Sequence, residues 1–258
     1  MNKINQTELS KILRLHTLWL QDEENGVRAN LSGRDLSYSN LRGSNLRDSD
    51  LRGSNLSGSN LRGSDLRGSD LRGSNLSGSN LRGSDLRGSN LSGSNLSGSN
   101  LSYSDLSDSD LSDSDLRGSN LSGSNLRGSN LRGSNLSDSD LSGRDLSYSD
   151  LSGSNLRGSN LSGSNLSGSD LSGSDLSGSD LSGAVGQNNW IKTLGSDIWH
   201  ITYTFDRMQI GCENHLITDW WQFDEERISR MNSGALDFWK RWKPILQEII
   251  KNNPAQAT

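Results

Sequence analysis

The chain has 258 residues, a formal net charge of −5 at pH 7 and a single cysteine, Cys212. It contains 51 Ser and 29 Gly residues and is only 29% hydrophobic, a composition that excludes a large layered globular core and is typical of linkers or disorder. The net charge is too small to indicate a nucleic acid or a membrane as a partner, and one cysteine excludes an internal disulfide framework.

Residues 1–28 are not repetitive and predict an N-terminal helical cap. Thr7 and Glu8 can open a helix, and Asn25-Gly26 can end it with a left-handed turn. Between them, the apolar face is formed by Leu9, Ile12, Leu13, His16, Trp19 and Leu20. The segment lacks the continuous apolar stretch of a signal peptide, so we expect a cytoplasmic protein without a membrane anchor.

Residues 29–183 are a strict pentapeptide repeat. Leu occupies every fifth position from Leu31 to Leu181, which gives 31 pentapeptides. With the leucine at position i, position i−1 is Asn or Asp, position i+1 is Ser or Arg, and position i+2 is Gly in 24 cases. Position i−2 is Ser except at Ala29, Arg34 and Arg144. A disordered chain does not keep such a phase, so the repeat predicts regular structure.

A five-residue step turns an α-helix by about 500°, so the leucines would not form one helical face. An extended segment suits the pattern better, because residues i−2 and i then point to one side and residue i−1 to the other. Gly at i+2 can turn the corner, and Asn or Asp can bond the local backbone. The repeat therefore predicts an all-β solenoid filled with stacked leucines.

This pattern resembles the pentapeptide-repeat family, whose consensus is a small residue, Asp or Asn, Leu or Phe, and two variable residues. The segments Leu13–Leu20 and Ile210–Lys243 also resemble the flanks of its phage and bacterial members. The resemblance implies a right-handed quadrilateral β-helix with 20 residues per coil, here about 7.75 coils and a rod about 37 Å long. The family usually has Ala at i−2; with Ser there, each inward hydroxyl needs a backbone partner or costs about 1–3 kcal/mol.

Residues 184–258 hold six of the seven tryptophans and predict an α/β capping and dimerisation module. Residues 199–205 alternate as a strand does, and residues 235–250 carry a helical apolar stripe that Pro244 should kink or split. The stripe includes Trp239, Trp242, Ile245 and Ile249, which we expect to cover the last coil and also to form a homodimer, as related proteins do through C-terminal helices.

The sequence predicts neither an enzyme nor a cofactor site. The repeat contains no His, Cys, Glu or Lys, and no Ser or Asp in it is set apart as a nucleophile or base. Cys212 and His215, with His200 as a third ligand, make half of a metal motif, and packing among the aromatic residues is the better interpretation. We expect no metal.

Charge is distributed unevenly along the repeat. Residues 34–87 carry nine Arg and six Asp, whereas residues 88–183 carry five Arg and twelve Asp. A nonapeptide containing Arg34 and Tyr38 recurs 110 residues later with Arg144 and Tyr148, on the opposite side of a 20-residue coil. The candidate partner-binding residues are Arg34, Tyr38, Arg144, Tyr148, Arg42, Arg62, Arg82, Asp105, Asp108, Asp110, Asp113 and Asp115.

We therefore expect a non-enzymatic binding or scaffold protein that offers a regular charged prism to a protein partner. The alternative is a partial DNA mimic that binds DNA gyrase or another DNA-processing enzyme through its acidic half, residues 88–183, as the resemblance to quinolone-resistance members implies. Duplex DNA as long as the whole rod carries about 22 negative charges, so mimicry by the whole repeat, with a net charge of −4, is disfavoured. Direct nucleic-acid binding is not expected.

Overall fold

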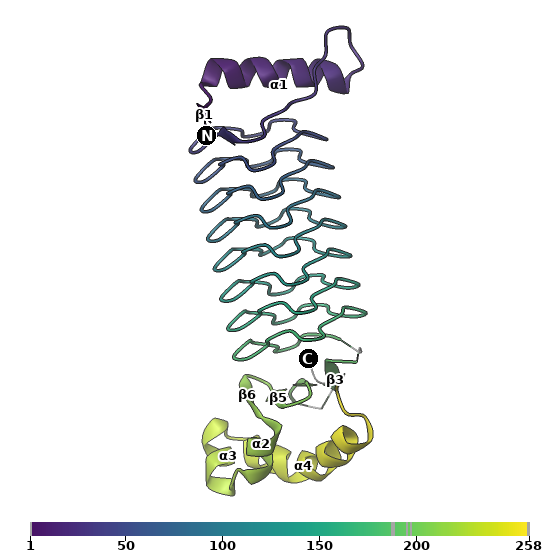
Figure 1. Cartoon of the computed structure of the whole chain (residues 1–258). Helices are drawn as coiled ribbons and strands as arrows, with labels where there is room; N and C mark the ends of the chain where they lie inside the picture. Colours follow the sequence, from purple (N-terminus) through teal and green to yellow (C-terminus); the bar gives the residue numbers. More distant parts are fainter. Residues whose placement is uncertain (1, 187–188, 195, 197, 257–258) are drawn as a thin grey trace.

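The computed structural model describes residues 2–186, 189–194, 196 and 198–256. Figure 1 shows a helix across one end of a stack of coils and an α/β module at the other end. Among the described residues, none of the helices combines the length and the apolar character needed to cross a membrane.

The N-terminal segment lies against the first coil. Strand β1 (Asn2–Lys3) pairs in parallel with β2 (Arg34–Asp35), and α1 (Gln6–Leu20) follows. The predicted helix is confirmed, although its N-cap is Asn5, whose side chain accepts from the backbone N–H of Glu8 at 2.9 Å. Leu9 is buried against the leucines of the coils. The segment therefore shares its core with the repeat.

The repeat folds into coils of 20 residues. Parallel bridges join residues 20 apart, such as Asn40 to Asn60 and Asn60 to Asn80, and recur at every fifth residue. From Leu31 to Leu166, the backbone N–H of each repeat leucine donates to a carbonyl of the next coil, as Leu31 does to Asp50 at 2.7 Å. This ladder satisfies the backbone along the stack, as a β-solenoid requires.

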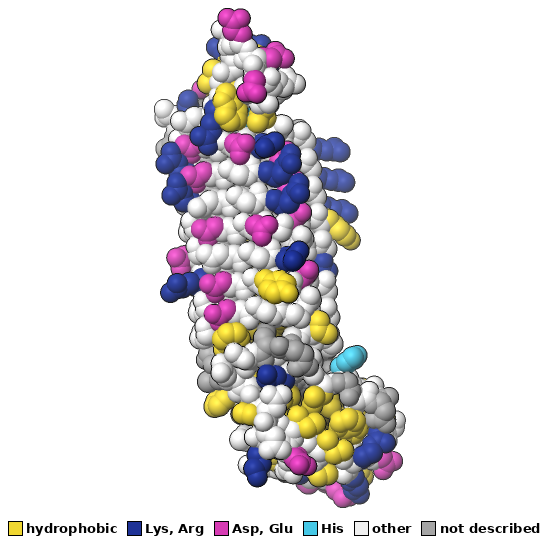
Figure 2. All heavy atoms as spheres, turned by 90° about the vertical axis from the view of Figure 1, so that its right-hand side faces the viewer, with side chains coloured by type: hydrophobic (Ala, Val, Ile, Leu, Met, Phe, Trp, Pro, Cys, Tyr) yellow, Lys and Arg dark blue, Asp and Glu magenta, His cyan; other side chains and the backbone are white. Residues whose placement is uncertain are grey.

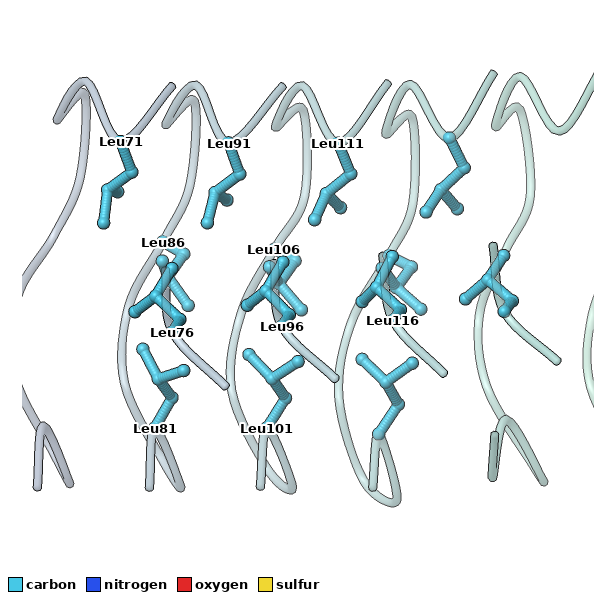
Figure 3. Close-up of a cluster of buried hydrophobic side chains, with 14 of the residues drawn as sticks. Leu71, Leu76, Leu81, Leu86, Leu91, Leu96, Leu101, Leu106, Leu111 and Leu116 are labelled. Carbon is cyan, nitrogen blue, oxygen red and sulfur yellow. The ribbon is translucent and has the colours of Figure 1, made fainter. Parts of the chain in front are cut away.

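Figure 3 shows the leucines of successive coils stacked inside the solenoid. From Ser49 onward the serines at i−2 are also buried, while the Asn or Asp that follows each of them is partly or fully exposed, which confirms the predicted alternation. The hydroxyl of Ser114 donates to the carbonyl of Leu111 at 2.6 Å. The buried hydroxyl of Ser94 and those of nine other serines have no partner among the described residues, which is the costly alternative.

The corners of the coils use a left-handed residue at i+2. Gly58 has φ of 63°, and the non-glycine residues at this position, such as Tyr38 with φ of 58°, adopt the same conformation. A Cβ added to Gly58 would lie 2.6 Å from the ring of Tyr38, so this ring lies over the glycine of the next coil. Glycine at 58 therefore serves both the turn and the close approach.

The described residues of the C-terminal module form one antiparallel sheet and three helices. The strands β3 (Lys192–Leu194), β4 (Ile201–Tyr203), β5 (Arg207–Ile210) and β6 (Glu213–Leu216) lie in sequence order. The helices are α2 (Ile217–Gln222), α3 (Glu225–Met231) and α4 (Ala235–Asn252). The predicted strand at 199–205 corresponds to β4. Helix α4 contains Pro244 and continues through it, so the helix is not split.

Candidate partner-binding surfaces

The outer surface of the rod is built from the residues on either side of each leucine. The side chain at i−1 accepts a hydrogen bond from the backbone N–H at i+1, as Asn30 does from Ser32 at 3.1 Å. This local turn holds the Asn or Asp in place and directs the i+1 side chain outward. The chemistry of the surface is therefore decided by which residues stand at i−1, at i+1 and at the corner position i+2.

Arginines that follow Asp-Leu are locked to that aspartate. Nε and Nη2 of Arg52 donate to the two carboxylate oxygens of Asp50 at 2.9 and 2.6 Å. The same paired bonds recur at Arg67, Arg72, Arg87 and Arg117. The hydrogen bonds from Arg52 hold the pKa of Asp50 below its usual value. These guanidiniums are satisfied within their own pentapeptides.

Arginines that follow Asn-Leu lack this carboxylate. Arg42, Arg62 and Arg82 belong to this group and lie in one column, since the bridges align Asn40, Asn60 and Asn80. All three are exposed, and none has an ion pair among the described residues. We call these three side chains the arginine stripe. At its end, the guanidinium of Arg82 lies 5.2 Å from the centroid of the Tyr103 ring.

The other arginines of residues 34–87 all have an acidic partner. Arg34 pairs with Glu8 at 3.2 Å and Arg47 with Asp48 at 3.3 Å, and the remaining arginines of this half are locked to aspartates. Nine Arg and six Asp leave a net charge of +3 in residues 34–87, and the three arginines of the stripe are those of this range without an ion pair among the described residues. Figure 2 shows basic side chains projecting outward from the N-terminal half of the rod.

Residues 88–183 have the opposite character. Asp105 lies 3.7 Å from Arg87, and Asp115 pairs with Arg117 at 2.7 Å. The other ten aspartates of this half have no ion pair among the described residues. They are Asp108, Asp110, Asp113, Asp138, Asp140, Asp145, Asp150, Asp170, Asp175 and Asp180. In the same half, Arg127, Arg132, Arg144 and Arg157 also have no ion pair among the described residues, so the excess of unpaired charge is negative.

The candidate aspartates do not form one compact patch. Asp105, Asp110 and Asp115 stand five residues apart, on successive sides of a 20-residue coil. Asp108 and Asp113 are corner residues with φ of 56° and 54°. This group therefore surrounds the rod instead of lining one face.

The repeated nonapeptide does not give two equivalent contact points. Tyr38 and Tyr148 are exposed, but the cation beside Tyr148 is Arg127, at 5.8 Å, and not Arg144. The side chain of Arg144 donates to the carbonyl of Ser142 at 2.5 Å, whereas Arg34 is held by Glu8. In both copies the guanidinium is thus bound to an acceptor of this chain. Position i−2 faces inward, so a charged side chain there needs such an acceptor close by.

The expected role of the α4 stripe as a lid is corrected by its packing. The core around the leucines includes Ile191 and Trp190 but, among the described residues, no residue of α4. Trp239 is buried against Trp220 and Trp221, and Trp242 stacks on Phe238. The apolar face of α4 covers the aromatic core of the module itself. Of the four residues in the predicted stripe, Ile245 is exposed.

The last coil is instead contacted by strands β5 and β6. Oε1 of Gln209 accepts from the backbone N–H of Leu181 at 2.7 Å, and Nδ2 of Asn214 donates to the carbonyl of Ser179 at 2.8 Å. These residues had no distinguishing pattern in the sequence. By contrast, the difference between Asp-Leu-Arg and Asn-Leu-Arg is visible there and separates arginines locked to the preceding aspartate from those that are not, of which Arg47 pairs with Asp48 at the next corner.

The module also contains the candidate metal ligands and a cavity. His215 forms a hydrogen bond of 2.9 Å with Glu213 and contacts the rings of Trp220 and Phe223, while Cys212 is exposed. Among the described residues, no group of three potential metal ligands lies close together.

A cavity of about 70 Å³ lies between the sheet and helices α3 and α4, with Trp199, Ile210 and Phe238 in its lining.

Comparisons with known proteins agree on one repeat type. A family model of pentapeptide repeats matches residues 27–63, 64–102, 104–143 and 145–183. A comparison with curated proteins gives no match.

Several solved structures are similar to parts of this chain. HetL, a pentapeptide repeat protein involved in heterocyst differentiation regulation in the cyanobacterium Nostoc sp. strain PCC 7120, is 29% identical over 72% of this chain and 98% of its own, with a TM-score of 0.32. A pentapeptide repeat protein from the thylakoid lumen of Arabidopsis thaliana is 25% identical over 45% of this chain and 67% of its own, with a TM-score of 0.34. QnrB1, a plasmid-mediated fluoroquinolone resistance protein, is 20% identical over 63% of this chain and 88% of its own, with a TM-score of 0.39.

Proposed function

This chain belongs to the pentapeptide repeat family, which folds as a right-handed β-helix, and we propose that it is a non-enzymatic rod that binds protein partners through its unpaired charged side chains. The observation that carries this proposal is the separation of unpaired charge along the rod. Three arginines have no acidic partner in one half, and ten aspartates have no ion pair in the other, among the described residues. Two oppositely charged surfaces on one scaffold suit the docking of charged protein surfaces.

The proposal includes the organisation of the chain. We assign residues 29–183 to the solenoid, with about 7.75 coils, and residues 1–28 and 184–258 to modules that cap its two ends in a cytoplasmic protein. Open ends of a β-solenoid expose unpaired backbone groups and associate with other edges. The contacts of β1 with Arg34–Asp35 and of Gln209 with Leu181 support the capping role.

Aspartate-to-asparagine exchange provides a direct test, because Asn occupies position i−1 in 17 of the 31 pentapeptides. Asp140, Asp145, Asp150 and Asp170 are replaced together by Asn, and the immobilised variant and the original chain are used to capture proteins from a bacterial lysate. The proposal expects partners that the original chain captures at low salt and that the variant loses. Partners retained equally by both, at low and high salt, would show that these charges do not carry binding.

A second candidate function is partial DNA mimicry directed at DNA gyrase. The ten unpaired aspartates favour it, since residues 88–183 carry a net charge of −7. Over the same length of about 23 Å, duplex DNA carries about 13–14 negative charges, so the acidic half reaches half of that density. A supercoiling assay with purified gyrase tests this function. The function is supported if micromolar protein inhibits gyrase or protects it from an inhibitor and the variant with Asn at 140, 145, 150 and 170 does neither. If the original chain has no effect on gyrase, this function is excluded.

We also propose that the chain forms a homodimer through α4. Ile245 is 42% exposed on this helix although its neighbour Leu246 is buried. An exposed apolar side chain beside a packed aromatic face provides the centre of a small isologous contact. Light scattering at tens of micromolar should give twice the mass of one chain, and Ile245→Lys should halve it. A monomer under these conditions would refute the dimer.

A further inference from the structure

We infer that the arginine stripe, formed by Arg42, Arg62 and Arg82, binds an extended acidic segment of a partner protein. This inference rests on the proposed function, because it assumes that the rod binds proteins, and it assigns one surface and one chemistry to that binding. It concerns the basic half, whereas the capture experiment above concerns the acidic half, so the two can fail separately.

The geometry of the stripe follows from the backbone ladder. The bridges Asn40–Asn60 and Asn60–Asn80 place the three arginines on successive coils of the same column. Neighbouring strands of a sheet lie about 4.8 Å apart, so three guanidiniums are anchored along about 10 Å of the rod. Each anchor is fixed by the bond from the arginine backbone N–H to the preceding asparagine, at 3.1–3.2 Å.

The unpaired state of these arginines is a property of their position. In the column on the opposite side of the coil, Arg52 pairs with Asp50 and also lies 3.6 Å from Asp70, so carboxylates alternate with the guanidiniums. In the stripe, neutral asparagines take the place of those aspartates. Three like charges at this spacing repel one another, and an anion bound between them relieves the repulsion. The stripe is therefore arranged to accept negative charge from outside the rod.

The stripe is short, and it ends after Arg82, on the side that faces the acidic half. The next residue in the column is Ser102, and Tyr103, which is 64% exposed, stands beside Arg82. On the same side of the following coils, Asn100 and Asn120 continue the ladder without charge. A ligand of this surface thus meets three cations, an aromatic ring and then a neutral polar face.

An extended peptide fits these dimensions. Side chains on one face of a strand repeat about every 6.8 Å, so two or three alternating carboxylates span the stripe within the reach of the flexible arginines. A nucleic acid fits less well, because its charge continues in both directions, whereas the column of the stripe continues with Ser102 and Ser122 and offers no further cation there. The finite length of the stripe therefore favours a short acidic segment.

The test uses the full chain and a fluorescein-labelled peptide of alternating Glu and Thr, followed by fluorescence anisotropy at low salt. In the stripe variant, Arg42→Ser, Arg62→Ser and Arg82→Ser are combined. Serine follows Asn-Leu elsewhere in the repeat, as at Ser92, where its hydroxyl bonds Asn90 at 2.8 Å, so the turn is preserved. The matched control combines Arg52→Ser, Arg67→Ser and Arg72→Ser, which changes the net charge equally at locked arginines.

We expect the stripe variant to bind the peptide about tenfold more weakly, while the control stays within about threefold of the original chain, because exposed ion pairs contribute modestly but add along the stripe. A triple Arg-to-Lys variant should retain binding. Equal loss in the stripe variant and the control would overturn the inference, since net charge alone would then explain it. Tighter binding of a single-stranded oligonucleotide than of the peptide would also overturn the inference. So would self-association of the original chain, if the stripe variant no longer self-associates.

Discussion

Oε1 of Gln209 accepts a hydrogen bond of 2.7 Å from the backbone N–H of Leu181, in the last coil of the solenoid. One coil earlier, the N–H of Leu161 donates to the backbone carbonyl of Asp180. The side-chain amide of Gln209 therefore takes the place of the carbonyl that a further coil would supply. Its Nε2 donates to the carboxylate of Asp180 at 2.8 Å, which fixes the orientation of the amide.

Replacement of Gln209 by Ala should lower the free energy of unfolding. The buried N–H of Leu181 would lose its acceptor, which costs about 1–3 kcal/mol. Urea denaturation followed by tryptophan fluorescence measures the change, since six of the seven tryptophans lie in residues 184–258. The control is Gln222→Ala, at an exposed residue that should change stability by less than about 0.5 kcal/mol. Equal effects of the two substitutions would contradict the role of Gln209.

The inward serines should divide into two classes on replacement by alanine. The hydroxyl of Ser94 is buried without a partner, and that of Ser114, one coil away in the same column, donates to Leu111. Ser94→Ala should therefore stabilise the chain by about 1 kcal/mol, whereas Ser114→Ala should destabilise it by a similar amount. Thermal unfolding of the two variants in parallel measures the difference. Shifts of the same sign and size would show that the two hydroxyls are equivalent.

The corner glycines should differ according to the residue one coil earlier. Gly58→Ala and Gly78→Ala both place a side chain at positive φ, which costs about 1–2 kcal/mol. Only the Cβ at 58 would also meet the ring of Tyr38, while that at 78 has open space, so Gly58→Ala should be the more destabilising. In a Tyr38→Gly background the two substitutions should become equal. A difference that persists there would rule out the ring as its cause.

Stability should fall as the pH is lowered through the range in which an exposed histidine gains its proton. Burial lowers the pKa of His16 below its model-peptide value of 6.5, and its Nδ1 accepts from the backbone N–H of Ala29 at 3.1 Å. The unfolded chain therefore binds more protons than the folded chain below about pH 6.5, so the stability present above that pH is progressively lost as the pH falls toward the folded pKa.

His16→Gln removes this linkage, and unfolding is compared at about pH 7.5 and pH 5.5 for both chains. The original chain should lose more stability than the variant between these two values. His200→Gln, at an exposed histidine, is the control and should leave the loss unchanged. If His16→Gln loses as much stability as the original chain, the loss arises from titratable groups other than His16.

The sequence allowed the solenoid to be predicted because its strict period specifies one backbone arrangement, and the inward and outward sides follow from alternation. The position of α4 was harder to predict, because an apolar stripe around Trp239 shows that a face is buried but not which surface covers it. Gln209 was missed for a related reason, since its contact with Leu181 spans 28 residues and leaves no local pattern.

For the arginines, the sequence does contain a local signal, which is the residue two positions earlier. Arg42 and Arg52 are both exposed residues at i+1, and columns alone do not distinguish them. The residue two positions earlier does, because Asp50 can lock a guanidinium in a pair of hydrogen bonds and Asn40 cannot. Which charges remain free is therefore predictable from pentapeptide sequence once this geometry is known.

The most direct test of the account is the comparison of partner capture by the original chain and by the variant with Asn at 140, 145, 150 and 170. Far-ultraviolet circular dichroism first establishes that both are folded. The account predicts partners that bind the original chain at low salt, that are released as salt rises, and that the variant does not capture. The same proteins captured by both chains regardless of salt would contradict the claim that unpaired charge carries the function.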